Sequence, residues 1–95
     1  MSRDEIRATV LAALQEIQEV SGRAWRDLSD DVKPLGALQG FDSLSAIEAT
    51  ICIEQRLGRE LAVETVFVSK DNNRPLTLSE VCDQVAQCFL AGQTT

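Results

Sequence analysis

A single serine stands at the start of a helix-forming stretch, within Gly40–Leu44 (Gly-Phe-Asp-Ser-Leu). Apolar residues follow it with the period of a helix, at Leu44, Ile47, Ile51 and Leu57, with Ile53 beside them. Because Gly58 supplies a stop signal, we expect a helix over about 43–57. Free amides and the helix dipole favour an anion at such a start, so the hydroxyl of Ser43 can carry a phosphate ester there.

The alternative is that Asp42 and Ser43 only cap this helix. Both residue types accept a hydrogen bond from the first amides of a helix and stabilise it by about 1 kcal/mol. The two interpretations are compatible, because Asp42 can cap the helix while Ser43 is modified.

The residues around this serine resemble the acyl carrier protein family. The matching residues are Leu35–Leu44, Ile47, Glu48 and Glu54, with Leu28–Val32 upstream. The resemblance covers roughly residues 6–90. It implies that a phosphopantetheinyl transferase esterifies Ser43 with the 4'-phosphopantetheine of coenzyme A. It further implies that the arm carries acyl or aminoacyl groups as thioesters in a biosynthetic pathway, and that the chain itself has no catalytic activity.

The same resemblance implies a partner-binding face on the helix that follows Ser43. Its residues would be Asp42, Leu44, Glu48 and Ile51, with Glu54 at the far edge. The partners implied are acyl- or aminoacyl-loading ligases or transferases and synthase enzymes with basic patches. Leu44 and Ile51 also lie on the apolar stripe, so the alternative is that they belong to the core.

One position departs from the family pattern and bears on the pathway. Ser45 stands where many fatty-acid carriers have an acidic residue. Together with Arg56 and Arg59, this change favours a carrier of a specialised pathway over a general fatty-acid carrier. The sequence does not choose the pathway or the group carried.

Composition excludes several function classes. The 95 residues predict one domain, 1–95, and the net charge of −6 disfavours nucleic acid or an anionic membrane as a partner. With no histidine in the chain, a Ser-His-Asp hydrolase cannot be built, and a zinc site of ordinary composition is disfavoured. The three cysteines, Cys52, Cys82 and Cys88, are expected to be buried thiols in a reducing cytosol. No apolar run reaches membrane-spanning length and no signal pattern opens the chain, so we expect a cytoplasmic protein.

Further helices are expected at both ends of the chain. Ser2–Glu5 is a capping box, and it opens a helix over about 3–20. A second capping box at Thr77–Glu80 opens a helix over about 78–90. The apolar stripes of these helices are Ile6, Val10, Leu14 and Ile17 in the first, and Leu78, Val81, Cys82, Val85 and Phe89 in the last.

The segments between these helices are less regular. The loop over 21–42 is long for so small a domain, and apolar residues at intervals would pin it across the bundle. Those residues are Trp25, Leu28, Val32, Leu35, Leu38 and Phe41. A short third helix or turn is expected at about 62–68, where β-branched residues also permit a strand, and a small hairpin is possible near 66–78. The predicted fold is therefore an all-α, acyl-carrier-like bundle of three main helices plus a short third one.

Two functional interpretations follow. In the carrier interpretation the bundle would sheathe an acyl chain, and the residues that could line such a space are Ile6, Val10, Leu14, Ile47, Ile51, Phe67 and Val85. In the competing interpretation the chain is a non-catalytic, acidic helical interaction module in which Ser43 stays unmodified.

Overall fold

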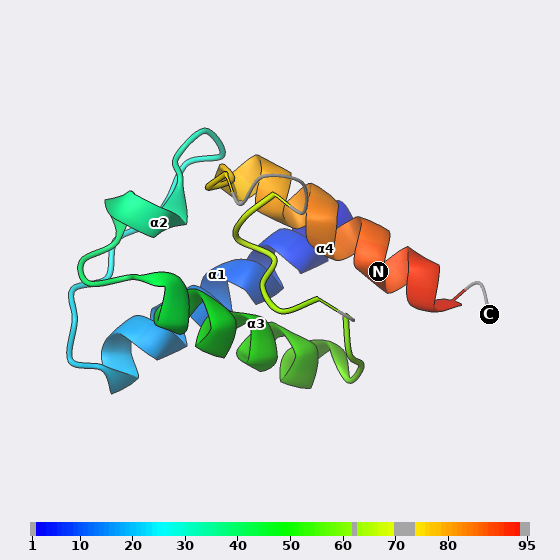
Figure 1. Ribbon diagram of the computed structural model, residues 1–95, viewed down its shortest axis with the longest axis horizontal. Coiled ribbons are helices and arrows are strands. Elements are labelled where there is room, and N and C mark those ends of the chain that lie inside the picture. The colour runs from blue at the N-terminus through cyan, green and yellow to red at the C-terminus, as the bar shows by residue number, and fades with distance from the viewer. Residues whose placement is uncertain (1, 62, 70–73, 94–95) are drawn as a thin grey trace.

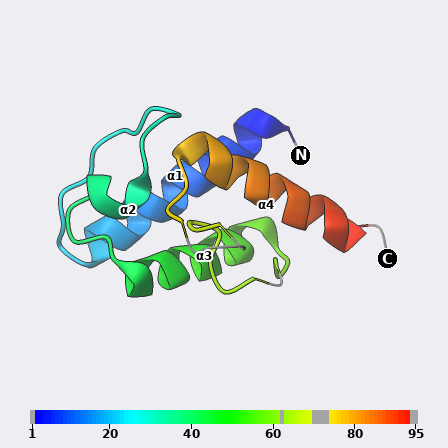
Figure 2. The same ribbon diagram turned by 45° about the horizontal axis from the view of Figure 1, so that its top comes forward.

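The chain folds around a central first helix. The computed structural model describes residues 2–61, 63–69 and 74–93, and its helices are α1 (Arg3–Val20), α2 (Pro34–Ala37), α3 (Ser43–Leu57) and α4 (Leu78–Gln93). Helix α1 packs against both α3 and α4. In both views the connection from α3 to α4 runs between these two helices (Figures 1 and 2). The described part of the chain is thus an all-α bundle without strands, as the sequence predicts.

The core lies where the three long helices and the α3–α4 connection meet. Its largest fully buried side chains include Phe67, Leu14, Ile53, Leu78, Val10, Val66, Val81 and Val85. The predicted stripes of α1 and α4 are therefore largely confirmed, although Ile17 and Phe89 are only partly buried. Within the described ranges, no helix is long and apolar enough to cross a membrane.

The ends of the first two long helices are those that the sequence predicts. The amide of Glu5 donates to Ser2 Oγ over 3.2 Å, and the amide of Ser2 donates to Glu5 Oε1 over 3.1 Å, which completes the capping box of α1. Helix α3 ends at Gly58, whose φ of 75° lies in the left-handed region that glycine adopts without strain. Helix α4 extends to Gln93, beyond the predicted end near residue 90.

Where a short helix or turn is expected, at about 62–68, residues 63–68 form bends and a bridge and no helix; residue 62 lies outside the described ranges. The amides here use side-chain acceptors instead of carbonyls one turn back: Val66 donates to Thr50 Oγ1 and Phe67 to Thr65 Oγ1, each over 3.2 Å. Short β-branched stretches have little reason to close a helical turn when such acceptors are available.

The predicted hairpin is present in reduced form. Val68 and Pro75 form an isolated antiparallel bridge, and the amide of Leu76 donates to the carbonyl of Phe67 over 3.0 Å. The residues between its two sides, 70–73, lie outside the described ranges. The bridge turns the chain back toward the start of α4.

The long loop over 21–42 is held against the bundle. Leu28, Leu38 and Phe41 are buried in the core, as predicted. The loop also contains the single turn α2, which the sequence does not predict. Two carbonyls of the loop accept hydrogen bonds from the first amides of α4. The amide of Leu78 donates to the carbonyl of Val32 over 2.8 Å, and that of Ser79 to the carbonyl of Asp30 over 2.9 Å. These bonds satisfy two of the amides that a helix start leaves without partners.

The capping box of α4 makes a pH-dependent contribution to stability. Hydrogen bonds from the backbone of Thr77 and from Arg74 lower the pKa of Glu80 from 4.5 to about 2. Because the pKa is lower in the folded chain, this stabilisation is complete above the unfolded value and is lost as the pH falls from 4.5 toward about 2. We expect the free energy of unfolding of Glu80→Gln to fall less than that of the wild type as the pH drops through this window. Urea unfolding at a series of pH values measures this free energy, with Glu60→Gln as the control. The same pH dependence for the wild type and Glu80→Gln would contradict the prediction.

Candidate functional site

Ser43 is the first residue of α3, and its neighbour performs the capping. Asp42 is the N-cap: its Oδ1 accepts from the amide of Ser45 over 2.9 Å, and its carbonyl accepts from the amide of Ala46 over 2.9 Å. The Ser43 side chain is exposed and makes no hydrogen bond to any described residue. Asp42 therefore takes the structural role, and the hydroxyl of Ser43 is free to react.

The charges at this helix start are mixed. The hydrogen bond from the backbone of Ser45 is the main cause that lowers the pKa of Asp42, and the positive charge of Arg23 lowers it further. The guanidinium of Arg23 donates to Ser45 Oγ over 2.8 Å. The amides of Ser43 and Leu44 belong to the first turn, so they have no acceptor within the helix. They are donors that an anionic group on Ser43 could use.

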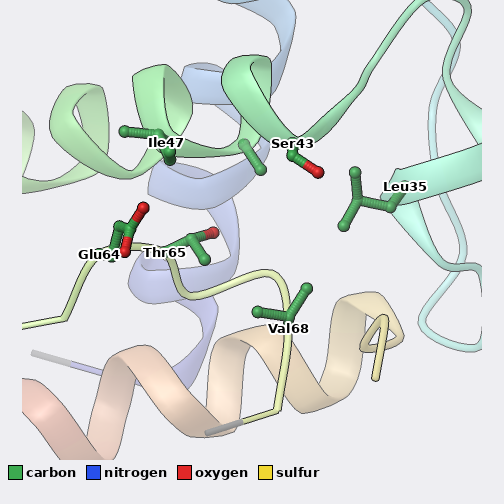
Figure 3. A pocket seen from close by; sticks show the side chains of 7 residues that line it. Leu35, Ser43, Ile47, Glu64, Thr65 and Val68 are labelled. Carbon is green, nitrogen blue, oxygen red and sulfur yellow. The ribbon is translucent and has the colours of Figure 1, made fainter. Parts of the chain in front are cut away.

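A cavity of about 330 Å³ opens beside the serine. We call it the Ser43 cavity, and its lining residues are Leu35, Ser43, Ala46, Ile47, Glu64, Thr65 and Val68. Figure 3 shows the hydroxyl of Ser43 directed toward Leu35, while Glu64 and Thr65 face α3 from the α3–α4 connection. Three separate segments, namely the α2 turn, the first two turns of α3 and residues 64–68, thus build one largely apolar space that holds the polar groups of Ser43, Glu64 and Thr65.

The loop before α3 is anchored under the end of α1. Gln18 is fully buried, and its Nε2 donates to the carbonyls of Ala24 and Gln39 over 2.9 and 2.8 Å. The side chain of Gln39 also contacts this part of the loop: its Oε1 accepts from the amide of Ala24 over 2.9 Å. These bonds join both ends of the loop and set the position from which α3 starts. Gln18 lies four residues after Leu14, on the same face of α1. Hydropathy does not mark this buried position, because glutamine is polar.

Gly40 allows the chain to pass close to Arg23. Its φ is +68°, and a Cβ built there would lie 2.8 Å from Arg23 Cδ and Nε. We expect Gly40→Ala to destabilise the fold by about 1–2 kcal/mol from the left-handed backbone alone, and by more because Arg23 must leave Ser45. Gly22→Ala is a matched control, with φ +70° and no atom within 4 Å of its Cβ. Urea unfolding measures both variants; equal losses would show that the contact with Arg23 carries no cost.

The apolar stripe predicted for α3 is only partly buried: Ile53 lies in the core, Ile47 and Leu57 are half-buried, and two members are exposed. Leu44 is 65% exposed and Ile51 is 48% exposed, so the alternative that they are core residues is wrong. Ala46 and Ala49 join Ile53 on the buried face of α3. Small residues there suit packing against α1, and Leu44 and Ile51 are left on the outer face.

The other residues of the expected partner-binding face differ in their surroundings. Asp42 and Glu48 are exposed beside Leu44 and Ile51. Glu54 is partly buried, and its Oε2 accepts from the amide of Leu61 over 2.8 Å. Its carboxylate therefore holds the connection after α3, and partner binding by this face stays a prediction. Ser45 is buried and bonded to Arg23, so its side chain is not part of the outer surface.

Most of the residues expected to line an acyl-binding space lie in the core of the bundle. Of the seven, only Ile47 lines the Ser43 cavity. Ile51 is exposed, whereas Ile6, Val10, Leu14, Phe67 and Val85 are buried in the core. The cavity instead uses Leu35, Glu64, Thr65 and Val68, which lie in irregular segments where no periodicity could mark them.

The three cysteines are free and buried, as expected. Burial raises the pKa of Cys52, and its Sγ donates to Glu16 Oε2 over 3.2 Å. Arg56 donates to the other oxygen of Glu16 over 2.9 Å. Burial also raises the pKa of Cys82, so these two thiols are kept protonated and unreactive.

Comparisons of this chain with models of protein families, with curated proteins and with solved structures find no match.

Proposed function

We propose that this chain is a carrier protein that presents an acyl or aminoacyl thioester on a 4'-phosphopantetheine arm attached to Ser43. The observation that supports it most is the free, exposed hydroxyl of Ser43 at the start of α3, next to a residue that already caps the helix. A serine needed only for capping would have its side chain bonded to a helix amide. Here Asp42 makes that bond.

The surroundings of Ser43 suit the arm. Transfer from coenzyme A forms a phosphoester bond at Ser43 Oγ and breaks the pyrophosphate bond, the serine proton is lost, and adenosine bisphosphate leaves. The amides of Ser43 and Leu44 and the positive end of the α3 dipole stabilise the phosphodiester. When attached, the arm supplies a thiol that forms the thioester. The Ser43 cavity offers an apolar space within reach of that attachment point.

The outer face of α3 supports brief encounters with partner enzymes. Leu44, which directly follows the serine, and Ile51, about two turns further along α3, are both exposed, and Glu48 lies between them. An apolar pair with an acidic residue suits partners that combine a small apolar pocket with arginine or lysine side chains. We propose that the transferase, the loading enzyme and the synthase enzymes dock on this face in turn.

The direct test is the intact mass of the folded chain after incubation with coenzyme A and a phosphopantetheinyl transferase of broad specificity. The proposal expects a gain of one phosphopantetheinyl group, located by peptide mapping on the peptide that contains Ser43. An unchanged mass with the native transferase as well, in a chain shown to be folded by circular dichroism, would contradict the proposal. It would favour the interaction module with unmodified Ser43.

A further inference from the structure

The lining of the Ser43 cavity carries information about the group on the arm, a question that goes beyond attachment itself. Four of its seven lining residues are apolar: Leu35, Ala46, Ile47 and Val68. The polar groups on the wall opposite α3 are the carboxylate of Glu64 and the hydroxyl of Thr65 (Figure 3). None of the residues that line the cavity is basic.

Glu64 is an acceptor without a partner. It is exposed, and it makes no hydrogen bond or ion pair with any residue in the part of the chain that the structure describes. Its negative charge therefore remains available to a group that enters the cavity. A carboxylate at the end of an acyl group would be repelled at this wall, while an ammonium would be attracted.

The hydroxyl of Thr65 is fixed in place on the cavity wall. Its Oγ1 accepts from the amide of Phe67 over 3.2 Å, which fixes the hydroxyl on the cavity wall. The hydroxyl of nearby Thr50 donates to the carbonyl of Ala46 over 2.8 Å and lies 3.4 Å from Thr65 Oγ1, which it also approaches as a donor, so no described residue accepts the proton of Thr65. The Thr65 proton can therefore turn to a carbonyl in the cavity. An alkyl chain laid over this hydroxyl would leave it without a good partner.

The size of the cavity points the same way. About 330 Å³ is at the lower end of the range for ligand pockets, which is about 300–1,000 Å³. A short acyl group fits this space.

We infer that the group carried at Ser43 is a short acyl group with a cationic amine, that is, an aminoacyl group, and that Glu64 and Thr65 select it. This inference rests on the proposed carrier function. The ammonium of the group pairs with the Glu64 carboxylate, and its carbonyl accepts from Thr65. Long alkyl and dicarboxylic acyl groups are disfavoured, the first because they offer no partner to Glu64 and Thr65 and the second by charge.

In the experiment, the full chain is loaded with phosphopantetheine arms that end in defined acyl groups. β-Alanyl and butyryl groups have nearly the same shape and differ in charge, and a succinyl group carries the opposite charge. Each is joined to the arm by an amide in place of the thioester, to prevent hydrolysis, and is transferred to Ser43 from the corresponding coenzyme A analogue. Intact mass confirms loading, and the readouts are the melting temperature and the amide chemical shifts of Glu64 and Thr65.

We expect the β-alanyl form to melt about 2–4 °C above the butyryl form, and the succinyl form to melt lowest. Glu64→Gln should remove the difference between the β-alanyl and butyryl forms. Glu60→Gln is the matched control, because Glu60 is exposed and does not line this cavity. Since an exposed ion pair is screened, 1 M salt should also shrink the difference to about zero.

The outcomes separate the two proposals. A wild-type chain that takes up no arm overturns the carrier function and the aminoacyl specificity with it. A loaded chain whose β-alanyl and butyryl forms melt alike, or whose difference survives Glu64→Gln, overturns the aminoacyl specificity alone.

Discussion

Ser43→Ala should take up no phosphopantetheinyl group under conditions that load the wild-type chain completely. The only change is the loss of the hydroxyl that would form the phosphoester bond. The variant should remain as stable as the wild type, within about 0.5 kcal/mol, because the Ser43 side chain is exposed and makes no bond to a described residue. The cap of α3 remains, since it comes from Asp42. Intact mass after incubation measures loading, and urea unfolding measures stability.

Ser21→Ala is the matched control for this experiment. Ser21 is also an exposed serine next to a long helix, at the end of α1, and it has no cavity beside it among those described. We expect this variant to load like the wild type. Loading of Ser43→Ala would show that another residue accepts the arm and would contradict the assignment of Ser43.

Phe67→Ala should destabilise the fold by about 3–5 kcal/mol, the usual cost of removing a large core side chain. Phe67 is fully buried, and its ring packs edge-on against Phe41 with centroids 5.5 Å apart. This pair joins the α3–α4 connection to the loop that leads into α3. Because Thr65 and Val68 line the Ser43 cavity from the same connection, the substitution should also loosen one wall of that cavity.

Urea unfolding of Phe67→Ala beside Phe89→Ala tests this prediction. Phe89 is only partly buried, and its ring carries the guanidinium of Arg59 at 4.6 Å from the centroid. We expect Phe89→Ala to lose clearly less stability than Phe67→Ala. If the two variants lose the same amount, the connection is not held by Phe67 in the way that its burial indicates.

The helices could be predicted because their ends are encoded locally. Ser2 and Glu5 bond to each other across one turn, and so do Thr77 and Glu80. Such signals need no knowledge of the rest of the chain. The end of α4 is less exact, since the helix extends to Gln93, beyond the predicted end near residue 90.

The orientation of α3 could not be predicted from hydropathy. The helix has two periodic faces, one with Leu44 and Ile51 and the other with Ala46, Ala49 and Ile53. Periodicity identifies both faces, and only packing decides which one is buried. Small residues on the buried face suit packing against α1, so Leu44 and Ile51 are left on the outer face.

The candidate site was only half predicted for a similar reason. Ser43 and its cap Asp42 follow from the motif and the helix behind it. Glu64 and Thr65 come from a segment without periodicity, and they reach the site because the buried residues Val66 and Phe67 beside them fix its course. Contacts of this kind depend on tertiary packing, which a local pattern does not contain.

The placement of the helix ends has a practical consequence for surface-based binding assays. In Figures 1 and 2, α1 begins and α4 ends on one side of the bundle, while α3 begins, with Ser43, on the other. A biotin or a fluorescent label attached through a flexible spacer at either of those two ends would face away from Ser43. The chain can therefore be immobilised on a sensor with its serine, its cavity and the outer face of α3 all turned toward the solution.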